Sequence, residues 1–299
     1  MKILVTGSNG MLGSALIDRL RTRCDVCGAG DQENQHADLR YIQLDITDAE
    51  SVRECVNSLK PQVIIHTAAY TDVDGCELDS QRAFHINAEG TKHLACAAKS
   101  VSAFFILISS DYVFSGKKAS PYVETDPPDP VSVYGKSKWK AEQYVRECLP
   151  ENSYLIVRTS WLYGPGRKNF VEKILKLAKT EKELRIAADS EGSPTYTIDM
   201  ADAIGQIISH PMFLTNRING FLNITNSGHT SWFGFAKEIL SLEGKSIPIH
   251  AIRSEEAGRP AKRPSYSVLD TKRFQSMTGE PLRSWKEALK DYLIRRKAE

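Results

Sequence analysis

Several features that would mark a special class of protein are scarce in this 299-residue chain. No run of apolar residues approaches the roughly 20 needed to span a bilayer, and the first residues hold too few basic side chains for a secretory signal peptide. Basic and acidic residues nearly balance, which leaves a formal net charge of +2 and no basic excess of the kind that nucleic-acid binders show. We therefore expect a cytoplasmic protein that binds neither nucleic acid nor membranes.

Cysteine is present, but its spacing builds neither a metal site nor a disulfide framework. Cys24 and Cys27 form a C-x-x-C that invites a redox or zinc interpretation. They fall on an expected strand, however, where residues three apart point to opposite faces. A second C-x-x-C or a nearby histidine pair, which would complete a metal site, is missing from the sequence. We expect six reduced thiols and no bound metal; the cysteines are Cys24, Cys27, Cys55, Cys76, Cys96 and Cys148.

What the first half of the chain does contain is a regular alternation of strand and helix patterns. Apolar runs predict strands at 2–6, 25–28, 41–44, 62–69, 103–110 and 154–160. Helical patterns follow at 11–21, within 45–59, at 80–100 and at 136–149, and Thr47 with Glu50 resembles a capping box. Such strands, separated by helices, predict a parallel sheet covered on both faces. Right-handed crossovers then give an α/β fold with a doubly wound sheet.

The alternation loosens after about Trp161. Helix-like segments at 169–179, 199–209, 231–242 and 284–295 mix with a short strand at 221–225 and with the proline-rich loops SPTYT and RPAKRPS. We therefore expect a dinucleotide-binding Rossmann domain at 1–160 and a smaller substrate-binding lobe at 161–299. Some segments of that lobe are expected to return to the first domain.

The stretch KILVTGSNGMLG joins the first strand to the first helix through Gly7, Gly10 and Gly13. A G-x-x-G-x-x-G spacing in this position is typical of a dinucleotide-binding turn. Gly7 allows the tight turn, Gly10 lets the backbone approach a pyrophosphate, and Gly13 lets helix and strand pack closely. The helix N-terminus then offers free N–H groups to the phosphates. The alternative is a purely structural turn.

Two acidic residues near strand ends are candidates for contact with the adenosine half of a dinucleotide. Asp31 lies 18 residues after Gly13, where a carboxylate hydrogen-bonds the ribose hydroxyls and favours NADH over NADPH; its alternative is a solvated loop residue. Asp45 follows the third strand, and its alternative is helix capping. The predicted cofactor residues are Gly7, Asn9, Gly10, Met11, Leu12, Gly13, Asp31, Asp45, Ile46, Ala68, Ala69, Tyr70, Ser109, Tyr134 and Lys138.

A Y-x-x-x-K pair, Tyr134 and Lys138, opens a helix in the stretch VYGKSK. Residues four apart share one helical face, and an ammonium group beside a phenol stabilises the phenolate and lowers its pKa. Ser110 ends the apolar strand AFFILISS, and in an open parallel sheet the ligand lies at the carboxyl ends of the strands. Tyr134, Lys138 and Ser110 are therefore the predicted catalytic residues. The alternatives are a surface helix pair for Tyr134 and Lys138, and Ser109 in place of Ser110.

Together these motifs resemble the extended short-chain dehydrogenase/reductase superfamily, whose members carry this fold and a Ser/Thr-Tyr-Lys set. Longer blocks are similar to one branch, the dTDP-4-dehydrorhamnose reductases: SSDYVFSG, RTSWLYGPGRKNFV, TAAYTDVDGCE and RPSYSVLDTKRF. The resemblance runs from Met1 to about Phe274. Ser110 stands where that branch usually has threonine, and His66 stands where asparagine is common. Ala15 replaces a glutamate associated with a metal-bridged dimer, so neither metal nor that dimer is expected.

The resemblance implies reduction of the C4 ketone of dTDP-4-dehydro-L-rhamnose by NADH or NADPH, with NADH slightly favoured by Asp31. Tyr134 would donate the proton, Lys138 would lower the pKa of that tyrosine and hold the ribose, and Ser110 would hydrogen-bond the ketone oxygen. A monomer or weak homodimer is expected.

The predicted substrate residues are Thr71, Val73, Ser110, Tyr112, Tyr134, Trp161, Asn169 and Arg263. The alternative role of Trp161 is core packing, and the alternative role of Arg263 is a surface salt bridge.

Three other functions fit parts of this pattern. A nucleotide-sugar epimerase or dehydratase shares the superfamily, although epimerases tend to carry a phenylalanine-asparagine pair near the SWLYG block. A 4-reductase of another dTDP-linked keto sugar uses the same chemistry. A regulatory subunit like that of methionine adenosyltransferase binds a dinucleotide without catalysis.

Overall fold

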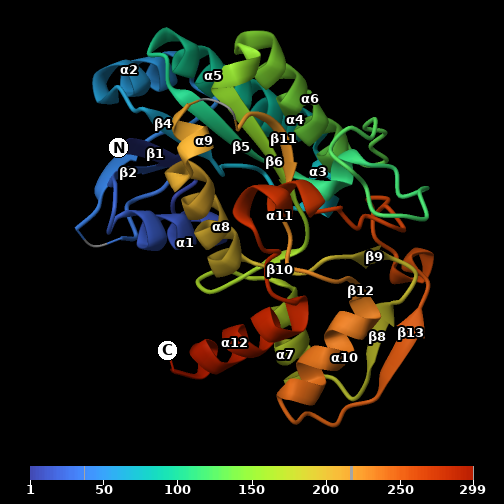
Figure 1. The fold of residues 1–299 in the computed structure, drawn as a ribbon. Coiled ribbons are helices and arrows are strands. Elements are labelled where there is room, and N and C mark those ends of the chain that lie inside the picture. Colours follow the sequence, from blue (N-terminus) through green and yellow to red (C-terminus); the bar gives the residue numbers. More distant parts are fainter. Residues whose placement is uncertain (37, 216–217, 299) are drawn as a thin grey trace.

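A seven-stranded sheet forms the centre of the molecule (Figure 1). The structure is a computed structural model and describes residues 1–36, 38–215 and 218–298. The strand order is β11-β6-β5-β4-β1-β2-β3, and every neighbouring pair is parallel. This confirms the predicted doubly wound α/β fold. The strands are β1 (Lys2–Thr6), β2 (Asp25–Gly30), β3 (Arg40–Gln43), β4 (Val63–His66), β5 (Phe104–Ser110), β6 (Tyr154–Thr159) and β11 (Gly220–Asn223).

Helices cover both faces of this sheet because successive side chains of each strand point to opposite sides. Ile3 and Val5 of β1 pack on one face against α1 and α8. Leu4, between them, packs on the other face, in the layer formed with α2, α5 and α6. The covering helices are α1 (Met11–Leu20), α2 (Ala49–Leu59), α5 (Gly90–Ser100), α6 (Val133–Cys148) and α8 (Thr197–Ser209).

A second group of elements lies below the sheet in Figure 1. Its core gathers Tyr163, Phe235, Trp285 and their neighbours around three helices and small two-stranded ladders. The helices are α7 (Phe170–Thr180), α10 (Trp232–Leu242) and α12 (Trp285–Ala298), and the paired strands are β8 (Leu184–Ala187) with β13 (Ile249–Ile252), β7 (Leu162–Tyr163) with β10 (Thr195–Tyr196), and β9 (Glu191–Gly192) with β12 (Thr230–Ser231). Shorter helices are α3 (Val73–Leu78), α4 (Ser80–Phe84), α9 (Pro211–Leu214) and α11 (Lys272–Thr278).

Two segments after residue 160 pack on the first half of the chain. β11 pairs with β6 at the edge of the main sheet, and α8 packs along α1. The predicted strand at 221–225 is therefore an edge strand of the large sheet. Among the described residues, no helix combines the length and the apolar character that crossing a membrane demands.

Several predicted boundaries are wrong for local reasons. Asp48, rather than Thr47, caps α2, because its carboxylate accepts hydrogen bonds from the backbone N–H groups of Glu50 and Ser51. The hydroxyl of Thr47 instead donates to Asp45. Helix α6 begins at Val133 instead of residue 136, since Ser132 supplies its N-cap.

The predicted helix at 80–100 is interrupted by a π-helical turn at His85–Glu89. Asn87 lies in this turn and is buried. Its side chain accepts a hydrogen bond from the Tyr70 N–H and donates to Ser137 of α6. The turn therefore fastens this helix to the loop after β4 and to the helix that carries Tyr134. Single π-helical turns are frequent at functional sites.

Candidate active site

A cavity of about 1370 Å³ lies along the carboxyl ends of the central strands. Every residue that the sequence predicts for cofactor, catalysis or substrate lines this cavity. The strand order reverses between β1 and β4, and in open α/β sheets ligands bind at such a switch point. The cavity therefore combines the position that the fold favours with the residues that the motifs indicate.

The glycine loop forms the wall at the end of β1. Gly7 has a positive φ of +70°, and a Cβ there would lie 2.6 Å from the backbone nitrogen of Ala68. A Cβ on Gly13 would collide with the carbonyl oxygen of Gly7. The start of α1 can therefore pack against the turn only because position 13 has no side chain. Gly10 precedes the first residue of α1, and the free N–H groups of that end suit a pyrophosphate. The cradle fits a dinucleotide.

The far side of this wall contains the residues predicted for the adenosine. Asp31 follows β2 directly and is exposed, and its backbone oxygen accepts a hydrogen bond from Gln43. The Asp45 carboxylate accepts from the N–H and hydroxyl of Thr47, both at 2.8 Å. Asp45 thus closes a local turn just before α2. The sequence left helix capping as the alternative role of Asp45, but Asp48 is the residue that caps α2.

Arg167 is a cavity residue that the sequence did not reveal. Its Nε donates to the backbone oxygen of Asn9 at 3.0 Å, and its Nη2 lies 3.3 Å from Oε1 of Gln35. It therefore connects the segment after β7 with the glycine loop. Sequence spacing gives no signal for a contact between residues 158 positions apart.

Tyr134 and Lys138 project from the first turns of α6; Lys138 is buried and Tyr134 is half-buried. Nζ of Lys138 donates to the backbone oxygen of Ile108 on β5 at 2.7 Å. Burial lowers the pKa of Lys138 to about 8, and Glu142 opposes that shift. Burial raises the pKa of Tyr134 above its ordinary value, and the neighbouring Ser110 hydroxyl opposes the rise. The net direction is opposite to the lowering expected from Lys138, because desolvation and the nearby charge of Asp111 both disfavour the phenolate.

Ser110 ends β5 beside this pair. Its hydroxyl donates to Oδ1 of Asp111 at 3.0 Å and accepts from the N–H of Tyr112 at 3.1 Å. The ring of Tyr112 meets that of Tyr134 edge to face, with centroids 5.7 Å apart. Ser109 has a different partner: its hydroxyl donates to Glu142 at 2.6 Å. The two serines therefore have separate roles, and Ser110 is the one whose neighbours are catalytic or substrate candidates.

Asp111 is a second cavity residue that the sequence analysis did not predict. Its position directly after Ser110, at the carboxyl end of a strand, could have indicated it. Only 2% of it is exposed, and its Oδ2 has no hydrogen-bond partner among the described residues. Burial raises the pKa of this carboxyl to about 7, against hydrogen bonds from neighbouring serines. An acid in this state changes charge near neutral pH.

Asp111→Asn should stabilise the protein strongly at pH 8 and much less at pH 4. The folded-state pKa of about 7 lies above the ordinary value of 3.8, so the stability that protonated Asp111 provides is complete only below about pH 3.8 and is lost as pH rises from there through about 7. An amide carries no charge and escapes this loss. Thermal unfolding at both pH values tests this, at about 2–4 °C per kcal/mol of relieved penalty. The exposed Asp25→Asn is the control; equal shifts at both pH values would contradict the expectation.

Two stacked indoles, those of Trp161 and Trp232, also line the cavity. Trp161 has a φ of +46°, which is unusual for a bulky residue and often marks a functional position. Its ring stacks on Trp232 with centroids 3.5 Å apart and planes 9° apart, and Trp232 also packs on Phe170. Trp161 is therefore part of both the cavity and the packing around it. Trp232 was missed, because its only signal is a contact across 71 positions of sequence.

The remaining substrate candidates differ in what holds them. Nη2 of Arg263 donates to Asp74 at 2.8 Å, and 12% of the arginine side chain and 33% of the aspartate side chain are exposed, so this ion pair is partly buried. Arg259, also in the cavity wall, forms no ion pair among the described residues. Asn169 caps α7 and donates to the Gly164 oxygen. Thr71 and Val73 lie in and after the loop that follows β4.

His66 plays a structural role, as its buried position on β4 predicts. Its Nδ1 lies 2.7 Å from the hydroxyl of Thr6, and its Nε2 lies 3.0 Å from the hydroxyl of Thr91. Burial and the charge of Lys138 lower its pKa to about 3. The ring is therefore neutral and joins β1, β4 and α5.

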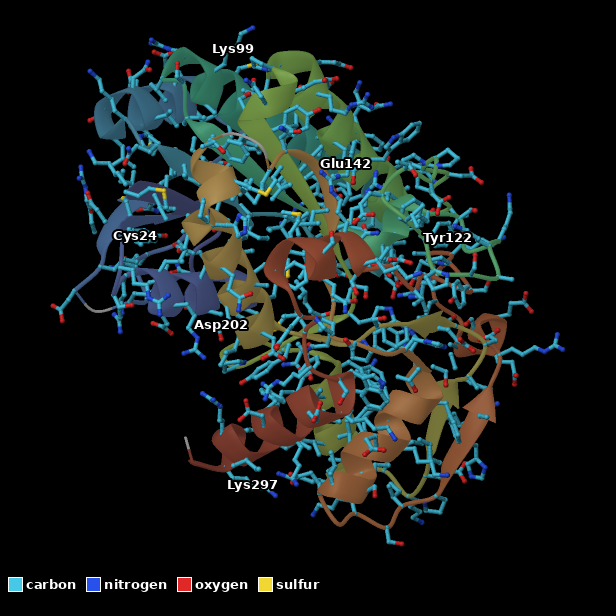
Figure 2. All side chains as sticks on the ribbon, viewed as in Figure 1. Cys24, Lys99, Tyr122, Glu142, Asp202 and Lys297 are labelled. Carbon is cyan, nitrogen blue, oxygen red and sulfur yellow. The ribbon has the colours of Figure 1, made fainter. Side chains whose placement is uncertain are left out.

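A buried ion pair lies behind the catalytic residues. Arg158 of β6 donates through Nε and Nη2 to both oxygens of Glu142, at 3.0 and 2.7 Å. Both side chains are at most 2% exposed, and Figure 2 labels Glu142 beside β6. Glu142 lies one turn after Lys138 on α6 and also accepts from Ser109. The pair thus joins β6 to β5 and α6, the strand and the helix that carry the predicted catalytic groups.

Comparison with known proteins agrees with this geometry. A family model described as RmlD substrate binding domain matches residues 1–297. The spore coat polysaccharide biosynthesis protein SpsK of Bacillus subtilis is 39% identical, over 99% of this chain and 98% of its own.

Two solved structures are similar over nearly their whole length. A dTDP-4-dehydrorhamnose reductase from Clostridium acetobutylicum is 39% identical, with a TM-score of 0.90 over 99% of this chain and 100% of that one. One from Bacillus anthracis, in complex with NADP, is 35% identical, with a TM-score of 0.88 over 98% and 99%. This chain therefore belongs to the RmlD substrate binding domain family, within the extended short-chain dehydrogenase/reductase superfamily.

Proposed function

We propose that this protein is an NAD(P)H-dependent reductase that converts dTDP-4-dehydro-L-rhamnose to dTDP-L-rhamnose. One observation carries the proposal: Tyr134, Lys138 and Ser110 share a single cavity with the glycine cradle at the end of β1. Family membership across residues 1–297 supports it, and so do the reductases among its relatives.

The residues of the cavity divide the reaction between them. Reduced nicotinamide supplies hydride when bound. Tyr134 donates a proton to the oxygen that was the C4 ketone; its phenol is protonated at neutral pH, since burial raises a pKa that is ordinarily about 10. Ser110 hydrogen-bonds the same oxygen as negative charge develops there. Lys138, held by the Ile108 oxygen, offers its remaining N–H groups to ribose hydroxyls.

The substrate occupies the other half of the cavity in this proposal. The indole of Trp161 contacts the sugar ring, where an aromatic surface suits the apolar C–H groups of a deoxysugar. Arg263 and Arg259 face the diphosphate, since a guanidinium matches phosphate geometry. Burial and the adjacent Arg263 lower the pKa of Arg259, which is consistent with a local excess of positive charge.

A coupled assay tests the proposed function. The protein is incubated with NADH or NADPH, a dTDP-4-keto-6-deoxyglucose substrate and a 3,5-epimerase, and absorbance of the reduced cofactor is followed. Oxidation that depends on both the sugar and the epimerase supports the proposal. Oxidation without epimerase would indicate a 4-reductase of another keto sugar, and no oxidation would indicate a regulatory protein.

We infer from Asp31 that NADH is favoured over NADPH. Asp31→Ala should shift the ratio of kcat/KM values toward NADPH by about 10- to 150-fold, because a charge-assisted hydrogen bond of roughly 1.5–3 kcal/mol is lost and repulsion of a 2′-phosphate ends. The exposed Glu33 lies in the same loop, so Glu33→Ala is a charge-matched control. An unchanged ratio for Asp31→Ala would show that this carboxylate is only solvated.

A further inference from the structure

Two thiols that are far apart in sequence meet on the surface of the sheet-bearing half. Sγ of Cys96 on α5 lies 3.0 Å from Sγ of Cys148, the last residue of α6, across 52 positions of sequence. Cys96 is exposed and Cys148 is half-buried. The other cysteines are free as well, and Cys27, Cys55 and Cys76 are buried.

We propose that Cys96 and Cys148 form an oxidisable dithiol, which closes to an intramolecular disulfide by exchange with a low-molecular-weight disulfide such as glutathione disulfide. The Cys96 thiolate attacks one sulfur of the oxidant and releases one thiolate. The Cys148 thiolate then attacks the Cys96 sulfur of the mixed disulfide and releases the second. Two protein thiols are oxidised and one small disulfide is reduced to two thiols, which take up the protons.

The surroundings of the pair favour this order of attack. Exchange requires a thiolate that the oxidant can reach, and Cys96 is the exposed partner. Burial and the adjacent Cys96 sulfur raise the pKa of the Cys148 thiol to about 12. Cys96 therefore reacts first. Once its sulfur is in a neutral mixed disulfide, its effect on Cys148 ends, and Cys148 is already in contact.

The packing of the two helices allows the sulfurs to close the remaining gap. α5 and α6 share one apolar layer, with Leu94 and Ala98 on one helix and Ala141 and Val145 on the other. Cys148 ends its helix, where the chain adjusts more easily than in a helix interior. The C-x-x-C of Cys24 and Cys27, which the sequence makes conspicuous, has no such sulfur–sulfur contact among the described residues.

The cross-link should stabilise the fold without blocking the cavity. Neither cysteine lines that cavity, and Cys148 lies ten positions after Lys138, which is about 15 Å along α6. The closed ring contains β5 and nearly all of α6. A cross-link over so long a loop restricts the unfolded chain strongly, so the oxidised protein should unfold at a higher temperature.

Titration of the folded protein with glutathione disulfide tests the proposal. Intact mass should fall by two hydrogen atoms, and the midpoint of thermal unfolding should rise by about 4 °C or more. Cys148→Ser should stop at a glutathione adduct on Cys96, and Cys96→Ser should stay unmodified. Unchanged mass, a disulfide between two copies of the chain, or an adduct on both cysteines of the wild type would overturn it.

Cofactor binding provides a second readout. The dissociation constant of NADH should be equal in the oxidised and reduced wild type, because the cross-link lies outside the cavity. A several-fold loss of affinity on oxidation, reversed by dithiothreitol, would contradict that part of the proposal.

Discussion

Tyr134→Phe should lower kcat by about 10²–10⁴-fold, the usual contribution of a positioned acid or base. Phenylalanine keeps the ring and its edge-to-face contact with Tyr112, so the cavity should keep its shape. Only the proton that reaches the ketone oxygen is removed. Rates at saturating cofactor and sugar measure the effect, and the dissociation constant of NADH should change little.

Tyr144→Phe is the matched control for that experiment. Tyr144 lies on the same helix, outside the cavity, and its hydroxyl donates to Glu89. It should keep wild-type kcat. A Tyr134→Phe protein with unimpaired turnover would exclude Tyr134 as the proton donor, and equal losses in both variants would point to damage to α6.

Glu142→Ala should lower the free energy of unfolding by about 3–5 kcal/mol, the usual cost of leaving one partner of a buried ion pair alone. Arg158 would retain its charge with 1% of its side chain exposed. It would keep one hydrogen bond, to the Glu124 backbone oxygen, and its contacts with the Phe114 and Phe221 rings. Urea unfolding at pH 7 measures the loss.

Two further variants distinguish the cost of the unpaired buried charge from the cost of shortening the Glu142 side chain. Asp129→Ala breaks an exposed pair with Lys117 and should cost at most about 1 kcal/mol. Replacing both Glu142 and Arg158, by Gln and Met, should recover much of the stability, since the uncompensated charge is gone. A double variant no more stable than Glu142→Ala would show that the loss arises from packing.

Much of the fold could be predicted because its signals are local. Strands such as 103–110 are buried on both faces and therefore read as continuous apolar runs. Gly7 and Gly13 occupy positions where a Cβ collides with backbone, so their spacing is set by sterics. Tyr134 and Lys138 share a helix face through their separation alone.

The rest could not be predicted because it depends on contacts between distant segments. Trp232 enters the cavity only when α10 packs beside Trp161, and Arg167 only when its loop meets Asn9. The predicted capping residue of α2, Thr47, is wrong because threonine and aspartate are both good caps. The hydroxyl of Thr47 donates to Asp45, which leaves Asp48 to cap the helix. The direction of the Tyr134 pKa shift could not be predicted, because it depends on burial of the side chain and the spacing of residues carries no information on burial.

The position of β11 in the sheet has a consequence for the synthesis of the chain and for truncated forms of it. A fragment ending near residue 160 would lack β11 and α8, leaving β6 as an unpaired edge and uncovering the part of one apolar face of the sheet that α8 covers. Exposed edges of this kind pair with other chains. During synthesis, the nucleotide-binding half therefore stays open to aggregation until residues 197–223 leave the ribosome, and a truncated form at that point should be insoluble.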